Sequence, residues 1–146
     1  MGGVLKAGMI GEAPTLDLHV TTAVITQQIT WHMYETLYTY DKNLSPIPML
    51  AEGHAVADGG RRYTITLRKG VRFHNGTELT AEDVRFTFAT LAKDGSANSL
   101  APEFRAIKSM EVEDPHTLAV RFEKPFVVFG NKVNQGLFAS SAARSA

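Results

Sequence analysis

The sequence of 146 residues contains no cysteine. A disulfide scaffold, a cysteine-liganded zinc site and a thiol nucleophile are therefore excluded. The chain also lacks an excess of charge of either sign, because fifteen Lys and Arg residues balance fifteen Asp and Glu residues. Electrostatics thus gives no reason to expect nucleic acid or an anionic membrane as a partner. A protein without net charge is, however, poorly protected against self-association.

Long apolar runs are missing as well. No stretch approaches the roughly 20 apolar residues that a transmembrane helix needs. No basic and apolar leader opens the chain, so we expect the signal peptide to be absent from it. The composition, 44% apolar and 21% charged, is that of a globular protein long enough to bury one core.

The most ordered pattern begins at Tyr63. Residues 63–68 alternate apolar and polar side chains, which predicts a half-buried strand with Tyr63, Ile65 and Leu67 on one face. Residues 74–76, His-Asn-Gly, predict a turn, because the pair Asn-Gly tolerates positive φ angles.

A helix is predicted to follow over residues 81–93. Thr80 and the acidic residues of the first turn have the spacing of an N-terminal capping box. Val84, Phe88 and Leu91 then recur at the spacing of one buried helical stripe. Glu82 and Asp83 would make a poor catalytic pair, because neighbouring side chains on a helix diverge by about 100°.

These residues carry a family resemblance. Residues 63–84, YTITLRKGVRFHNGTELTAEDV, resemble the motif of family 5 of the bacterial extracellular solute-binding proteins, the dipeptide, oligopeptide and nickel receptors of ABC importers. Two upstream pieces match in the same order: residues 16–17, and residues 34–38 followed by residues 48–52. The resemblance covers residues 3–126.

The resemblance implies an α+β fold. It corresponds to part of a periplasmic-binding-protein type II fold, namely the first strand plus the small subdomain of lobe one, with a mostly antiparallel sheet and packed helices. Residues 1–130 would form this partial lobe-one domain. Residues 131–146 are small and polar without periodicity, so we expect a disordered or non-native tail. Complete members of the family are much longer, which suggests a fragment or a reduced relative.

Several further elements are expected. Residues 4–10 are predicted to form the first strand, and residues 49–52 one helical turn. Residues 22–39 are predicted to form a largely buried helix, because apolar side chains recur every four residues. On this helix the aromatic side chains favour core packing over stacking on a ligand. The apolar stripe and the aromatic residues are Ile25, Ile29, Met33, Leu37, Trp31, Tyr34 and Tyr38.

Later turns and strands are also indicated. Residues 58–60, Asp-Gly-Gly, predict a hairpin turn that enters the strand at Tyr63. Residues 117–122 predict a second strand, and residues 114–116 a turn before it.

The loop after the first predicted strand is the best binding candidate. Such a loop can offer backbone amides and carbonyls to an extended peptide. The family resemblance implies ligand contact at Gly11, Glu12, Ala13 and Pro14. The alternative is an ordinary surface loop in which Asp17 caps the following turn.

Catalytic and metal sites are not indicated. None of the five histidines is spaced three or four residues from another, so no metal pair is visible, and each is expected to face solvent or form hydrogen bonds. No nucleophile elbow, phosphate loop or zinc-protease motif occurs. We therefore expect neither an enzyme nor a cofactor; a hydrolase using Glu12 or Asp17 lacks recognisable partner residues.

The resemblance implies a function in transport. The protein would capture short peptides or related small solutes in the periplasm or outside the cell and deliver them to the membrane subunits of an ABC importer. The mechanism would be hinge closure of two lobes. Because this chain has room for only part of one lobe, we expect it to bind peptides weakly or not at all by itself. The alternative is an isolated scaffold or self-association module without a ligand of its own.

Overall fold

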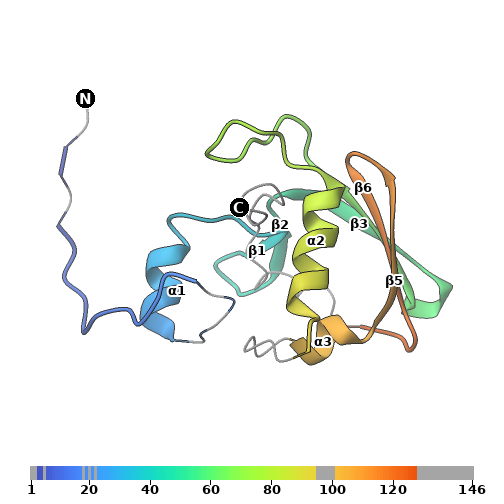
Figure 1. Ribbon diagram of the computed structural model, residues 1–146, viewed down its shortest axis with the longest axis horizontal. Coiled ribbons are helices and arrows are strands. Elements are labelled where there is room, and N and C mark those ends of the chain that lie inside the picture. Colours follow the sequence, from blue (N-terminus) through green and yellow to red (C-terminus); the bar gives the residue numbers. More distant parts are fainter. Residues whose placement is uncertain are drawn as a thin grey trace.

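A four-stranded antiparallel sheet is the largest element of the computed structural model and lies at the right of Figure 1. The structure describes residues 3–4, 6–17, 19, 21, 23–94 and 101–127. The sheet has the order β3-β4-β6-β5. Its strands are β3 (Ala51–Ala57), β4 (Arg62–Leu67), β5 (Ile107–Asp114) and β6 (Thr117–Phe122).

Shorter elements complete the fold. A two-stranded ribbon consists of β1 (Tyr38–Tyr40) and β2 (Pro46–Pro48). The helices are α1 (Val24–Thr30), α2 (Ala81–Leu91) and α3 (Ala101–Arg105), and η1 (Asp58–Gly60) is a 3-10 turn between β3 and β4. The architecture is α+β, as expected, and no helix in the described ranges has the length and apolarity needed to span a bilayer.

The predicted strand at Tyr63 is central in the sheet. β4 pairs with β3 on one side and with β6 on the other. Tyr63, Ile65 and Leu67 all point into the core, where Ile65 and Leu67 are fully buried. The second predicted strand is also confirmed as β6, and its apolar side chains join the same core. Alternation with period two therefore located both central strands.

Helix α2 covers one face of the sheet and contacts β5 and β6 (Figure 1). Its predicted capping box is present at Thr80. The Asp83 carboxylate accepts hydrogen bonds from the Thr80 backbone N–H at 2.9 Å and from the Thr80 hydroxyl at 2.8 Å. Val84 and Phe88 are completely buried. The cap fixes where the helix begins, and so fixes which side chains reach the sheet.

The first predicted strand does not form. The described residues between 3 and 10 are irregular, and Val4 and Ile10 are almost fully exposed. A strand is stabilised by hydrogen bonds to a neighbouring strand. The described part of the chain places no such neighbour beside these residues, so the apolar pattern alone does not produce a strand.

The long helix predicted over residues 22–39 is also wrong. α1 ends at Thr30, after which the N–H groups of His32 and Met33 bond to carbonyls three residues back and tighten the chain into a turn. The buried side chains of α1 are Thr26 and Thr30 rather than the isoleucines. Thr30 directs its hydroxyl to the Thr26 carbonyl at 2.9 Å, so polar groups on the buried face are satisfied locally.

Two apolar residues that were assigned to that helix pack in the main core instead. Leu37 and Tyr38 are buried in the main core cluster; Leu37 lies in a bend and Tyr38 begins β1. The Leu37 carbonyl accepts bonds from the N–H groups of Met49 and Ala51 at 2.9 and 3.1 Å. Residues 49–50 form a bend and residues 51–52 begin β3, so the predicted helical turn there is wrong. The predicted tail, residues 131–146, lies outside the described residues.

Candidate functional site

The loop predicted to contact ligand lies along α1, away from the sheet (Figure 1). A Cβ atom placed on Gly11 would lie 3.8 Å from Ile25 Cδ1. Four residues later, the Thr26 hydroxyl donates to the Thr15 carbonyl at 2.9 Å. The hydrogen bond holds the loop against α1 at Thr15, and the Cβ distance shows that Gly11 also lies close to the helix.

The four predicted ligand contacts leave their backbone accessible. Gly11, Glu12 and Pro14 are exposed and Ala13 is half-buried. Their backbone groups form no hydrogen bond to another described residue. This arrangement is compatible with main-chain pairing to an extended peptide, and ligand contact at these four residues stays a prediction.

The structural role considered for Asp17 is present. Its carboxylate oxygen Oδ1 accepts the N–H of His19 at 2.8 Å, and its own N–H donates to the Thr15 hydroxyl at 3.1 Å. Both bonds are of the local side-chain-to-backbone type that shapes turns. Asp17 therefore terminates the exposed loop and leaves Gly11, Glu12, Ala13 and Pro14 as its accessible part.

A groove of about 680 Å³ opens between residues 31–35, which follow α1, and residues 71–79. Trp31 lines it with 63% of its surface exposed. The sequence favoured core packing for Trp31 and Tyr34, which is wrong for Trp31, while Tyr34 is half-buried in the groove wall. Sequence reasoning missed this groove because it placed Trp31 inside a continuous helix.

The second wall of the groove is a hairpin-like loop at residues 71–79. Phe73 N–H donates to the Thr77 carbonyl at 2.8 Å, and Leu79 N–H to the Val71 carbonyl at 2.9 Å. Gly76 sits in the predicted turn with φ of 87°, a conformation that favours glycine. Backbone hydrogen bonds therefore join the two arms of the loop, and the turn predicted at residues 74–76 is confirmed.

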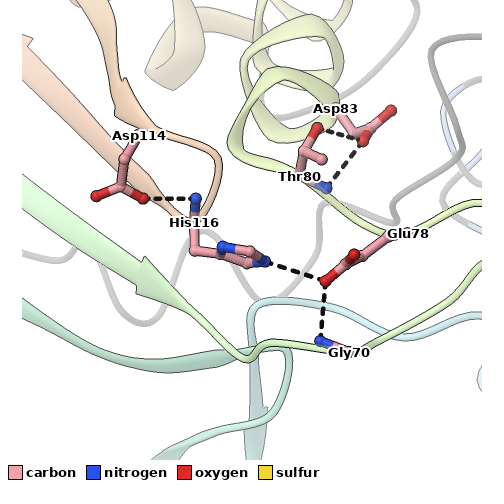
Figure 2. Close-up of polar contacts among 6 residues, drawn as sticks. All are labelled: Gly70, Glu78, Thr80, Asp83, Asp114 and His116. Carbon is pink, nitrogen blue, oxygen red and sulfur yellow. Dashed lines mark hydrogen bonds and ion pairs between the residues drawn. The ribbon is translucent and has the colours of Figure 1, made fainter.

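A polar network attaches the base of this loop to the sheet (Figure 2). Glu78 Oε1 accepts the Gly70 N–H at 3.0 Å and lies 3.2 Å from His116 Nε2, which must carry the proton because the carboxylate has none. The backbone N–H of His116 donates to Asp114 Oδ1 at 2.7 Å. Glu78 thus joins the end of β4 to the turn between β5 and β6.

The same bonds change the acidity of the two carboxyl groups. The pKa of Glu78 is lowered, first by the Gly70 N–H and then by the hydrogen bond from His116, with smaller contributions from the charges of His116 and Arg72. The pKa of Asp114 is lowered, first by the hydrogen bond that its carboxylate accepts from the backbone N–H of His116. Both groups are therefore held ionised at neutral pH, where the network is complete.

A second histidine forms a side-chain hydrogen bond on β3. The Tyr38 hydroxyl lies 2.6 Å from His54 Nδ1, and burial raises the pKa of Tyr38 to about 12. Burial lowers the pKa of His54, so its ring is neutral near pH 7 and Nδ1 can accept a hydrogen bond from the Tyr38 hydroxyl. The hydrogen-bonded role expected for histidines is confirmed for His54 and His116.

Within the described residues no group of three His, Cys, Asp or Glu side chains is arranged to hold a metal ion.

Comparisons with known proteins identify relatives over most of the chain. The glutathione-binding protein GsiB of Salmonella choleraesuis is 32% identical over 117 residues, covering 80% of this chain and 23% of GsiB. The oligopeptide-binding protein AppA of Bacillus subtilis is 31% identical over 144 residues, covering 99% of this chain and 25% of AppA. The chain thus spans about a quarter of the length of these relatives.

Solved structures show the same fold. The structure of AppA from Bacillus subtilis in complex with a nonapeptide superposes with a TM-score of 0.84 and 25% identity, over 94% of this chain and 27% of that one. The model of the family "bacterial extracellular solute-binding proteins, family 5 middle" matches residues 45–144. The chain therefore belongs to family 5 of the bacterial extracellular solute-binding proteins.

Proposed function

We propose that this chain is part of a solute-binding protein that captures short peptides or related small solutes, in the periplasm or outside the cell, for an ABC importer. The observation that carries the proposal is the likeness to an oligopeptide-binding protein over 99% of this chain. The protein acts as a binding protein rather than an enzyme, and it delivers its ligand to the membrane subunits of the importer.

In this proposal the exposed loop beside α1 supplies one wall of the ligand cleft. Gly11, Glu12, Ala13 and Pro14 present backbone groups that are unpaired within the described part of the chain. Backbone contacts fix the main chain of a peptide and leave its side chains free, which suits a receptor of broad specificity. The remaining contacts come from a second lobe that closes by a hinge motion. This chain alone therefore binds peptides weakly.

Two-dimensional amide NMR with added short peptides tests this loop. We expect small shifts confined to the amides of residues 11–17, with saturation only at high peptide concentration. Ala13→Pro removes one amide donor and should abolish the shifts, whereas Glu12→Ala keeps every backbone amide and should preserve them. A spectrum that ignores peptides would remove the loop from the proposed cleft, and tight binding would contradict its dependence on a second lobe.

A second candidate function is a scaffold that associates with another copy of itself. Several large apolar side chains are exposed in the described residues, among them Val24, Leu44 and Val56. The zero net charge adds no repulsion between copies. Sedimentation analysis in the absence of peptide tests the scaffold, which requires a mass that rises with protein concentration. The peptide titration by NMR tests the receptor, because a scaffold alone leaves the amides of residues 11–17 unchanged.

A further inference from the structure

The groove between residues 31–35 and residues 71–79 carries opposite charges on its two walls. Glu35 belongs to the wall that follows α1, and Arg72 to the hairpin-like loop. The Glu35 carboxylate is exposed and has no ion-pair partner in the part of the chain that the structure describes. Arg72 uses Nη1 to bond the Gly76 carbonyl at 2.7 Å, which holds its guanidinium at the loop and leaves further N–H donors.

Aromatic side chains line the same groove. Trp31 and Tyr34 come from one wall and Phe73 from the other. Aromatic faces bind apolar side chains and also attract ammonium groups. The volume of about 680 Å³ falls in the range of small-molecule sites, and the few charged groups would set the orientation of a ligand.

The Glu78 network makes one wall of the groove rigid. Glu78 ties the base of the hairpin-like loop to Gly70 and to His116 in the turn between β5 and β6 (Figure 2). The loop is further closed by the bond from Phe73 to Thr77. A wall that is already ordered loses little conformational entropy when it binds a ligand.

We propose that this groove is a peptide-binding site in its own right, separate from the Gly11, Glu12, Ala13 and Pro14 loop. It takes a short zwitterionic peptide with apolar side chains. The amino terminus of the peptide lies at Glu35, its carboxylate lies at Arg72, and its side chains lie against Trp31, Tyr34 and Phe73. The peptide class of the ligand rests on the proposed function; the position of the site rests on the groove alone.

Trp31 is the single tryptophan of the sequence, so intrinsic fluorescence reports on this groove directly. The experiment titrates the chain with the dipeptide leucyl-phenylalanine, which has no indole or phenol group. We expect a saturable blue shift of the emission, because the ligand removes the exposed indole from water. Acetylating the amino terminus of the peptide should weaken binding roughly two- to fivefold, the effect of one exposed ion pair.

The variant Glu35→Gln identifies the partner of the peptide amino terminus. In this variant the free and acetylated dipeptides should bind equally, because the pair that distinguishes them has been removed. Glu52→Gln is the matched control, since Glu52 is also an exposed glutamate but does not line the groove. It should retain the full difference between the two peptides.

Three outcomes would overturn the groove site. One is a fluorescence spectrum that does not respond to the dipeptide while the amides of residues 11–17 shift; the proposed function would then survive without the groove. Another is an equal response of Glu35→Gln and the parent chain to acetylation. The last is a blue shift that follows protein concentration without peptide, which would assign the groove to a second copy of the chain.

Discussion

Glu78 links acidity to stability at the scale of a single residue. Its lowered pKa means that the folded chain binds the carboxyl proton less readily than the unfolded chain does. The stabilisation is therefore complete at pH values above the ordinary carboxyl pKa of 4.5 and is lost as the pH falls through the lowered value. Asp114 contributes with the same sign, because its pKa is also lowered.

We predict that Glu78→Gln melts at a lower temperature than the parent chain at pH 7, and that the two melting temperatures converge on acidification below pH 4.5. The amide cannot carry the charge that the Gly70 and His116 donors stabilise. Thermal unfolding followed by circular dichroism between pH 3 and pH 7 measures the difference. Glu123→Gln, an exposed glutamate outside the network, serves as the control. A constant difference at every pH would show that Glu78 acts by packing rather than by charge.

Helix α2 supplies a prediction at the scale of an element. Phe88 is completely buried, and its ring centre lies 5.0 Å from that of Phe104 in α3. Phe88→Ala should lower the free energy of unfolding by about 3–5 kcal/mol, through lost burial and the cavity left behind. Phe86→Ala on the same helix removes a ring of equal size from a half-buried position and should cost clearly less. Urea denaturation measures both, and equal losses would contradict the assigned face of α2.

The same scale shows what the sequence predicts well. β4 was located because alternation is a local signal and its neighbours β3 and β6 are both present in the chain. The start of α2 was located because the Thr80 cap is built from residues three apart. For α2, the residues that specify its start lie close together in the sequence. For β4, the strands that it pairs with lie within the described chain.

Elements that depend on distant contacts were predicted poorly. Leu37 fits a helical period of four. Its carbonyl, however, accepts hydrogen bonds from the N–H groups of Met49 and Ala51, and its side chain packs in the sheet core. Residues 4–10 have the composition of a strand, but the described part of the chain offers their described residues no strand to pair with. The loop of Gly11, Glu12, Ala13 and Pro14 was proposed from the family motif, and its exposed backbone follows from contacts with α1 that the local sequence does not encode.

At the scale of the whole molecule, the net charge determines how strongly copies of the chain repel one another. Fifteen basic and fifteen acidic residues leave no net charge near pH 7, while the described surface exposes apolar side chains such as Val24 and Leu44. Neighbouring molecules then attract through apolar contact without electrostatic opposition. Below pH 6, protonation of histidines among the five in the sequence adds positive charge and restores repulsion.

We therefore predict that the weight-average mass of the chain rises with concentration at pH 7 and rises much less at pH 5.5. Sedimentation equilibrium at both pH values measures this, at low ionic strength so that repulsion is not screened. Added salt at pH 5.5 should restore association, because screening removes the repulsion but leaves apolar contact intact. Equal association at both pH values, with no response to salt, would show that net charge does not control contact between copies.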